Sequence, residues 1–283
     1  LAVAQKNEIR EAGAFDTSDE KDMVLLGFIG FLDPPKQSAA QAITALQEHG
    51  VKVVVLTGDS EGVAVKVCSK VGVDTEHCLT GVDVEAMSDK ALCKAVRECC
   101  LFSKLSPAQK QRVVAAFQAN GHTVGYMGDG INDTLAMRQS DVGISVDSAV
   151  DIAKETADII LMKKDLMVLE QGVLEGRRTF GNIMKYIKMA ASGNFGNMIS
   201  VVLASILFPF LPLKPVQILA QNLLCDFAQL GIPFDRVDDS YLKTPHKWDT
   251  GSIQKFMFSM GPLSSLFDLC CYGVLWWAMG ANS

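Results

Sequence analysis

Two hydrophobic patterns alternate between residues 23 and 162 of the chain: continuous apolar runs of strand length, and segments with apolar residues at helical spacing. Residues 23–32 and 51–56 are apolar runs, and residues 39–49 between them have helical spacing that ends at Gly50. Continuous apolar strands separated by helices are typical of a parallel sheet covered on both faces. The pattern therefore predicts an α/β parallel-sheet domain.

The alternation continues to residue 162. Ser106 and Pro107 form an N-cap and first-turn pair before one of the predicted helices. The pattern predicts further strands at 79–80, 100–102, 122–127, 142–146 and 159–162, and further helices at 60–71, 84–98 and 107–119.

The pattern changes after residue 188. Residues 189–208 are a run of 20 without a charged side chain, and a helix of that length is roughly 30 Å long, enough to cross a bilayer core. Residues 216–234 and 256–280 are two further apolar segments, with one carboxylate each, Asp226 and Asp268. Charged residues fall from 47 of the first 188 to 11 of the last 95. The sequence therefore predicts an α-helical transmembrane region with three helices.

Basic residues predict the orientation of these helices. The loop between the first two spans holds only Lys214, whereas basic residues flank the other ends, and the positive-inside rule then places the N-terminal block and residues 235–255 in the cytoplasm. Residues 172–187 have helical spacing and run into the first span, so a rigid stalk is expected. The flanking basic residues are Arg177, Arg178, Lys185, Lys188, Arg236, Lys243, Lys247 and Lys255.

The net charge limits the kind of partner that the protein binds, and the cysteines indicate its cellular compartment. A net charge of −6 provides no basic excess to meet phosphates, which argues against nucleic acid. The eight cysteines contain no C-x-x-C pair and indicate reduced thiols in a cytosol-facing protein. The chain starts inside an apolar stretch without an initiator Met and stops soon after an apolar segment, so we expect it to be a fragment.

The loop Gly128-Asp129-Gly130-Ile131-Asn132-Asp133 follows a predicted strand. Two carboxylates at the carboxyl end of a strand suit Mg²⁺, with water and phosphate oxygens completing its shell. Gly128 and Gly130 allow close approach of the backbone. The alternative is an ordinary turn with a capping aspartate.

Thr57-Gly58-Asp59 ends another predicted strand, where a hydroxyl and backbone N–H groups can hold a phosphoryl group. The alternative is an N-cap of the following helix. Lys110, one turn into the helix that begins at Pro107, could neutralise phosphoryl charge, or could be a solvated lysine.

Polar side chains also lie inside the predicted spans. Asn194 and Asn197 share one face of the first span, and Asn222 and Asp226 share one face of the second. Amide and carboxylate oxygens suit a hard cation, and intramembrane carboxylates are costly and usually functional. The alternative is polar helix packing beside Gly193 and Gly196.

In this order, the motifs resemble the haloacid-dehalogenase-type phosphotransfer fold, and together with the membrane spans they resemble P-type ATPases. Residues 33–36 (DPPK) resemble the family's hinge motif, Thr57-Gly58-Asp59 its phosphate-gripping motif, residues 102–110 (FSKLSPAQK) the segment with the phosphate-contacting lysine, and residues 128–133 the Mg²⁺ loop.

The resemblance implies a role for each of these residues. Asp129 would coordinate the Mg²⁺ of a phosphorylation site, with Asp133 as its partner carboxylate. Asp133 and Asn132 would orient Lys110 and the phosphoryl oxygens, while Thr57, Gly58 and Asp59 would hold the phosphoryl group of ATP. The family's nucleophilic aspartate, in an Asp-Lys-Thr-Gly-Thr motif, is absent from this sequence. We therefore expect it on a missing N-terminal part, without which the chain should be inactive.

The resemblance extends to the membrane part and the domain order. Asn194, Asn197, Asn222 and Asp226 match ion-binding positions of the fifth and sixth membrane helices, and Asn197 stands where calcium pumps carry an acid. Residues 232–249 and the third span look most like the magnesium-importing P-type ATPases of bacteria, which implies an integral protein of the inner or plasma membrane that transports Mg²⁺. The implied domains are the end of a nucleotide-binding domain (1–22), a cytoplasmic phosphorylation domain (23–170), a stalk (171–188) and a transmembrane region (189–283, with helices 189–208, 216–234 and 256–280).

Three other interpretations stay open. One is a calcium or other cation pump of the same family. Another is a phosphatase tethered by membrane anchors, which leaves the aligned Asn222 and Asp226 unexplained. The third is a non-catalytic membrane interaction module, which leaves residues 128–133 unexplained.

Overall fold

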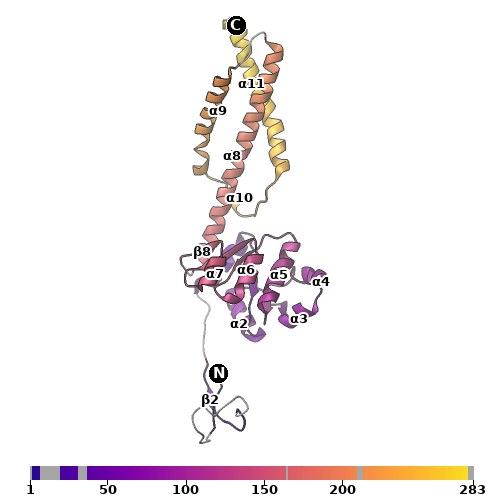
Figure 1. The fold of residues 1–283 in the computed structure, drawn as a ribbon, viewed down its shortest axis with the longest axis vertical. Helices are drawn as coiled ribbons and strands as arrows, with labels where there is room; N and C mark the ends of the chain where they lie inside the picture. The colour runs from indigo at the N-terminus through magenta and orange to yellow at the C-terminus, as the bar shows by residue number, and fades with distance from the viewer. Residues whose placement is uncertain (1, 7–19, 31–36, 164, 209–212, 280–283) are drawn as a thin grey trace. The chain divides into compact units, whose positions relative to one another are not determined.

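The computed structural model describes residues 2–6, 20–30, 37–163, 165–208 and 213–279, and its chain divides into two units, Leu1–Lys36 and Gln37–Ser283 (Figure 1). The resemblance implied a first domain boundary after residue 22. The domain assignments themselves stay predictions. The hinge-like motif at 33–36 lies outside the described residues.

The first unit corrects one prediction. Residues 23–32 were expected to form a buried strand of the parallel sheet. The strand observed there, β2 (Val24–Phe28), instead pairs antiparallel with β1 (Ala2–Gln5). Val24 is 68% and Phe28 78% exposed. An isolated two-stranded ribbon has no second layer on which to bury a face, which explains the exposure.

Among its described residues, the second unit contains two three-stranded parallel sheets rather than one continuous sheet. The first sheet has the order β3-β5-β4 and the second has the order β6-β7-β8, with every pairing parallel. The parallel arrangement of strands that the sequence predicted is confirmed. Strands β3 and β6 each lie at the edge of their sheet. The strands are β3 (Val55–Leu56), β4 (Cys78–Thr80), β5 (Leu101–Ser103), β6 (Gly125–Met127), β7 (Val142–Val146) and β8 (Ile159–Leu161).

Short helices connect these strands, and one of them differs from the prediction. Residues 84–98 were expected to form a single helix, but the chain forms α3 and α4, separated at Met87 and Ser88. The Ser88 side chain accepts a hydrogen bond from the Ala91 N–H, so it starts a new helix as an N-cap. The helices are α1 (Gln37–Glu48), α2 (Glu61–Val71), α3 (Gly81–Ala86), α4 (Asp89–Ala95), α5 (Pro107–Ala119), the 3₁₀ helix η2 (Ile131–Asp133), α6 (Thr134–Gln139) and α7 (Asp151–Thr156).

Helix α5 lies in the cores of both sheets. Its Val113 packs in one cluster with Phe102 of β5, and its Val114 packs in another with Tyr126 of β6. Each of these valines is at most 1% exposed. The helix is therefore held firmly between the two sheets, and so is Lys110 in its first turn.

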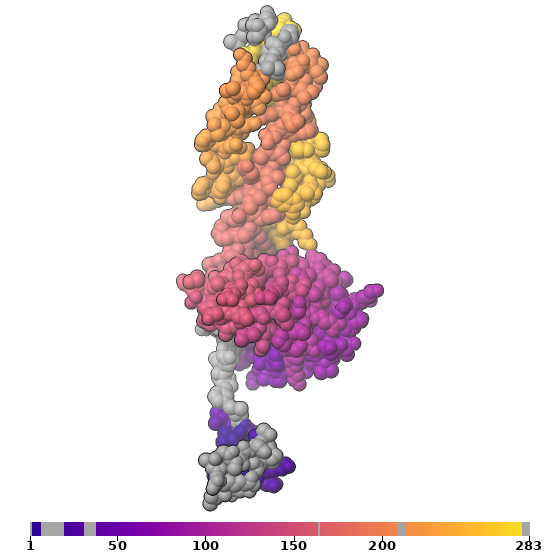
Figure 2. All heavy atoms as spheres, viewed as in Figure 1, coloured from indigo at the N-terminus to yellow at the C-terminus, as the bar shows by residue number. Residues whose placement is uncertain are grey.

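The C-terminal half is helical (Figures 1 and 2). Helix α8 (Leu166–Leu207) has 42 residues, roughly 63 Å, and joins the predicted stalk and first span without a break. Helix α9 (Pro215–Gln229) ends earlier than predicted, because Gly231 and Pro233 interrupt the helical pattern. It is followed by the 3₁₀ helix η3 (Ile232–Phe234), α10 (Asp239–Leu242) and α11 (Thr250–Met279).

Within the described residues, two helices are long and apolar enough to cross a membrane: α8 and residues Thr250–Ala278 of α11. Only 17% of the most apolar window of each is buried. A core helix of a soluble protein would bury most of these side chains, so the exposure agrees with a helix that faces lipid.

Helices α8 and α11 pack closely at a seam of small residues. A side chain on Gly196 would lie 2.9 Å from the carbonyl oxygen of Gly261, so each glycine permits the approach of the other helix. Across the seam the Ser265 hydroxyl donates to the Gly196 carbonyl at 2.8 Å, and the Ser200 hydroxyl lies 2.6 Å from the Asp268 carboxylate.

The loop between α9 and α11 lies against the α/β domain. Lys247 donates to the carbonyl of Gly121, and Arg177 of α8 donates to the carbonyls of both His49 and Leu242. The positive-inside rule placed this loop and the α/β domain on one side of the bilayer, and these contacts agree with that placement.

Candidate functional site

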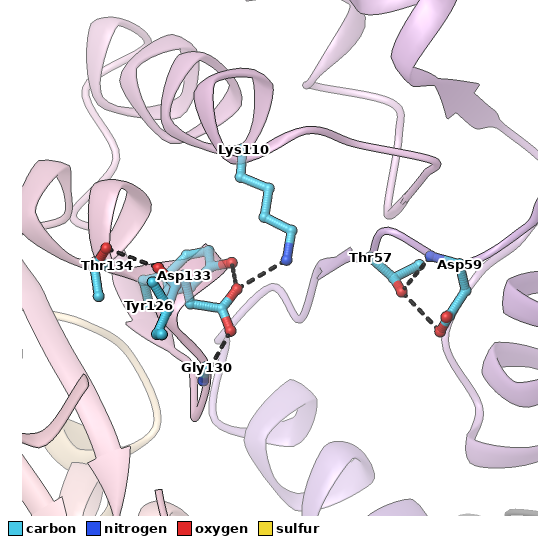
Figure 3. Close-up of polar contacts among 8 residues, drawn as sticks. Thr57, Asp59, Lys110, Tyr126, Gly130, Asp133 and Thr134 are labelled. Carbon is cyan, nitrogen blue, oxygen red and sulfur yellow. Dashed lines mark hydrogen bonds and ion pairs between the residues drawn. The ribbon is translucent and has the colours of Figure 1, made fainter. Parts of the chain in front are cut away.

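Asp133 and Lys110 form the centre of the site in the α/β domain (Figure 3). Lys110 Nζ donates to Asp133 Oδ1 at 2.8 Å, and the Tyr126 hydroxyl donates to the same oxygen at 2.9 Å. The Gly130 N–H donates to the other carboxylate oxygen at 3.4 Å. Asp133 thus holds Lys110 in one position.

Burial explains why this pair is maintained. Lys110 is only 8% exposed, and an ammonium group out of water requires a charged partner. Lys110 is therefore not the solvated lysine of the alternative interpretation. The loop geometry also requires Gly128, because a side chain there would lie 2.4 Å from the Asp133 Cβ atom.

The pKa of Tyr126 is affected by its contact with this pair. Its burial raises the pKa of the phenol, and the negative charge of Asp133 and the hydrogen bond to it raise the pKa further. The phenol therefore stays a donor to Asp133.

Asp129 and Asn132 lie on the same loop with exposed side chains. The Asp129 carbonyl accepts a hydrogen bond from the Val150 N–H, which ties the loop to the start of α7. Among the described residues no group of three or more His, Cys, Asp and Glu side chains is placed to hold a metal ion. Mg²⁺ in phosphoryl-transfer sites usually takes one or two carboxylates, with water and phosphate oxygens filling its shell, so an exposed Asp129 fits such an ion.

The loop of Thr57, Gly58 and Asp59 follows β3. The Thr57 hydroxyl donates to Asp59 Oδ2 at 2.9 Å, and the Asp59 N–H donates to Thr57 Oγ1 at 3.1 Å. The next residue, Ser60, stands at the N-cap of α2 without a side-chain capping bond. The loop therefore does not act as the helix cap that was the alternative interpretation.

The fold brings the two loops toward one lysine. Both loops follow parallel strands, and Figure 3 shows the Lys110 side chain reaching from α5 into the space between Asp133 and Thr57. The predicted phosphate-site residues Thr57, Gly58, Asp59, Lys110, Asp129, Asn132 and Asp133 thus lie on three neighbouring segments of one domain.

The predicted transport residues are less closely gathered. The Asn197 amide oxygen accepts from Gln221 Nε2 at 3.2 Å, a contact between α8 and α9 that the sequence analysis did not anticipate. Gln221 is the sequence neighbour of Asn222. Its uncharged amide within an apolar span is the sequence signal that could have identified it as a candidate residue. Asn194 and Asp226 are exposed, and Asp226 lines a cavity beside the stalk part of α8.

Comparison with known proteins extends over the whole chain. A family model described as haloacid dehalogenase-like hydrolase matches residues 4–141, and a second, cation transporting ATPase, C-terminus, matches residues 210–283. The chain is 50% identical over all 283 residues to the magnesium-transporting ATPase, P-type 1, of Escherichia coli K12, and covers 32% of that protein. It is 53% identical over 265 residues, 94% of the chain, to a Salmonella typhimurium LT2 protein of the same name, of which it covers 29%.

The chain belongs to the P-type cation-transporting ATPases. It spans about a third of the length of the curated magnesium-transporting relatives that it matches. A calcium-transporting ATPase of Bacillus subtilis is 34% identical over 228 residues, 79% of the chain and 26% of that protein. P-type ATPases use ATP and Mg²⁺, and the predicted location in a membrane is confirmed by the relatives and by the two apolar helices.

Proposed function

We propose that this chain forms the phosphorylation site and part of the cation path of an ATP-driven pump that transports Mg²⁺. The observation that carries the proposal is the buried Lys110–Asp133 pair, whose ammonium lies between two loops at strand ends. The identity of 50% to magnesium-transporting relatives supports the choice of ion.

In this proposal Lys110 binds the oxygens of the transferred phosphoryl group and neutralises their charge. Asp133 keeps the ammonium in position, because it accepts from Lys110 while Tyr126 and Gly130 hold its carboxylate. The Thr57 hydroxyl and the Gly58 backbone bind further oxygens, while Asp59 positions Thr57 and Asn132 helps to orient the phosphoryl group.

Asp129 would hold Mg²⁺ at this site, with Asp133 nearby, and the ion when bound supplies positive charge toward the phosphoryl oxygens. The sequence contains no Asp-Lys-Thr-Gly-Thr motif. We therefore propose that the carboxylate that accepts the phosphoryl group, forming an aspartyl phosphate, comes from a segment outside this sequence.

The transported ion would pass oxygens of α8 and α9. Asn194 and Asn197 lie on α8, Asn222 and Asp226 on α9, and Gln221 joins the set through its bond to Asn197. Amide oxygens and one carboxylate suit a cation that keeps several waters, as Mg²⁺ does. The surrounding partner is the lipid bilayer, because both long helices expose apolar side chains.

A calcium pump is the second candidate, since calcium-transporting ATPases are also relatives. The uncharged Asn197 favours Mg²⁺, because tight Ca²⁺ sites bring more carboxylates directly to the ion.

The test uses the full-length pump with Asp226→Asn, and with Asp268→Asn as the matched control, since Asp268 is the carboxylate bonded to Ser200 in the α8–α11 seam. We expect Asp226→Asn to abolish Mg²⁺ stimulation of ATP hydrolysis and Mg²⁺ uptake into vesicles, and the control to keep both. Unchanged uptake in Asp226→Asn would remove that residue from the cation path, and stimulation by Ca²⁺ instead of Mg²⁺ would favour the second candidate.

A further inference from the structure

Lys104, between β5 and α5, has an unusual backbone conformation. Its φ is +51°, and among the described residues Asp22 is the other non-glycine residue with a positive φ. A lysine rarely adopts this left-handed conformation, because its Cβ atom comes close to the following carbonyl oxygen. The Lys104 side chain is exposed, so its own packing does not explain the conformation.

The conformation turns the chain back toward the loop of Thr57, Gly58 and Asp59. Strands β3 and β5 are parallel, so later residues of one strand lie opposite later residues of the other. Beyond the strands this order is reversed. The Lys104 N–H donates to the Asp59 carbonyl at 2.9 Å. The next N–H, of Leu105, donates to the earlier Thr57 carbonyl at 3.0 Å. Continued parallel strands would not make these two bonds in that order, so the turn at Lys104 is what permits both.

The carbonyl of Lys104 is confined from the other side. A Cβ atom on Gly81, the first residue of α3, would lie 2.3 Å from the Lys104 carbonyl oxygen, closer than such atoms can approach. Gly81 is buried, and its own carbonyl accepts from Gln109 Nε2 of α5 at 3.1 Å. Residue 104 is therefore held between the Thr57–Asp59 loop and α3.

The same segment leads directly to Lys110. Leu105 is 5% exposed and belongs to the core cluster that contains Phe102 of β5, and Ser106 is the N-cap of α5. The Thr57–Asp59 loop is thus tied by hydrogen bonds to a short, anchored segment that carries Lys110 in its first helical turn. Figure 3 shows this loop and Lys110 on neighbouring segments.

We propose that Lys104 is a positioning residue of the phosphate site, and that its left-handed backbone, packed against Gly81, sets the Thr57–Asp59 loop relative to Lys110. The role belongs to the backbone of Lys104 and not to its ammonium group. Groups that bind one phosphoryl group must lie within about 0.5 Å of the productive geometry, so a change in this turn weakens binding without removing a contact. The inference rests on the proposed function, which assigns Thr57 and Lys110 to the phosphoryl oxygens.

The experiment uses orthovanadate, a phosphate analogue, and measures the concentration that half-inhibits ATP hydrolysis by the full-length pump. Lys104→Val should raise this concentration roughly tenfold, because a side chain branched at Cβ strongly disfavours a positive φ. Lys104→Gly and Lys104→Asn should stay within about twofold of the parent, although both remove the positive charge, because glycine and asparagine tolerate this conformation. A loss of stability alone would lower the amount of active pump but would not change the half-inhibiting concentration.

Gly81→Ala tests the other side of the turn, and it carries the test if Lys104→Val does not fold. Its new Cβ atom must displace the Lys104 carbonyl, so the half-inhibiting concentration should again rise roughly tenfold. Gly62→Ala, in the first turn of α2, is the matched control, since a Cβ atom there would meet nothing within 4 Å. It should be inhibited like the parent.

Two results would overturn the inference while leaving the proposed function intact. One is parent-like inhibition of Lys104→Val or, where that variant does not fold, of Gly81→Ala. The other is equal weakening in Lys104→Gly and Lys104→Val, which would assign the effect to the lost charge. A parent pump that orthovanadate does not inhibit would instead contradict the proposed phosphorylation site, and the inference would fail with it.

Discussion

The two predicted sites of this chain differ in how far its own residues complete them. In the α/β domain, Asp133 accepts from three donors, and Lys110 is held by it. In the helical region, Asn194 and Asp226 are exposed, and Asn197 accepts one hydrogen bond from Gln221. The residues of the predicted phosphate site are thus organised by contacts within this chain, whereas those of the predicted cation path are less closely held.

The cores of the two regions show the same contrast. Phe102 of β5 is fully buried, while Phe267 and Trp277 of α11 are 67% and 89% exposed. A parallel sheet brings its strand ends to one edge and buries its side chains against covering helices. A membrane helix satisfies its own backbone, and its apolar side chains need lipid or other helices rather than a water-excluding core.

The largest expected effect concerns the completed site. Lys110→Met should lower phosphoenzyme formation from ATP in the full-length pump by roughly 10²–10³-fold, because one charged contact to the phosphoryl group is lost. Lys94→Met, on the exposed face of α4, is the control and should behave like the parent. Normal phosphorylation of Lys110→Met would show that the buried pair is structural only.

A packing change tests whether the membrane region has a core of its own. A side chain on Gly261 would lie 2.7 Å from Phe195 of α8, whereas one on Gly273 of the same helix would meet nothing within 4 Å. We expect Gly261→Val to cost about 1–3 kcal/mol of stability in thermal unfolding of the detergent-solubilised protein, and Gly273→Val to cost little. Equal losses would mean that lost helix flexibility, rather than the α8–α11 contact, matters.

A smaller effect is expected at the start of α5. The Ser106 hydroxyl accepts from the Gln109 N–H at 3.3 Å, and Gln109 Oε1 accepts from the Ser106 N–H at 3.0 Å, which forms a capping box. Ser106→Ala should destabilise the domain by about 1 kcal/mol, and Ser106→Gly by a few tenths, as judged by urea unfolding followed by circular dichroism. A larger loss for glycine would contradict the capping role.

The smallest effect is a pH dependence. Because burial and Asp133 raise the pKa of Tyr126, its phenol should stay protonated above pH ~10, where exposed tyrosines ionise. Stability from this group is complete below the unfolded pKa and is lost as the pH rises through the folded pKa. Ultraviolet absorbance titration should therefore show a late-ionising tyrosine that Tyr126→Phe removes, and a titration unchanged by that substitution would contradict the assignment.

Local signals predicted several elements closely. Helix α5 spans Pro107–Ala119 as expected, because Ser106 and Pro107 mark its start, and β7 spans Val142–Val146 because its run is apolar throughout. The prediction for 84–98 was wrong in one respect, since helical periodicity continues across Ser88 although its hydroxyl begins a second helix. The predicted burial of the strand at 23–32 was also wrong for its described residues, because an apolar run does not show whether a covering layer exists.

For the sites, residue type and order along the chain predicted Thr57, Asp129 and Asp133 as neighbours, because strand ends of a parallel sheet meet at one edge. Lys110 was predicted from its charge in the first turn of a helix. Residue type was also enough to select the amides and the carboxylate of the spans. The Lys110–Asp133–Tyr126 contacts and the Gln221–Asn197 bond were decided by tertiary structure. Their side chains come from segments far apart in the chain, and only packing determines which donor reaches which acceptor.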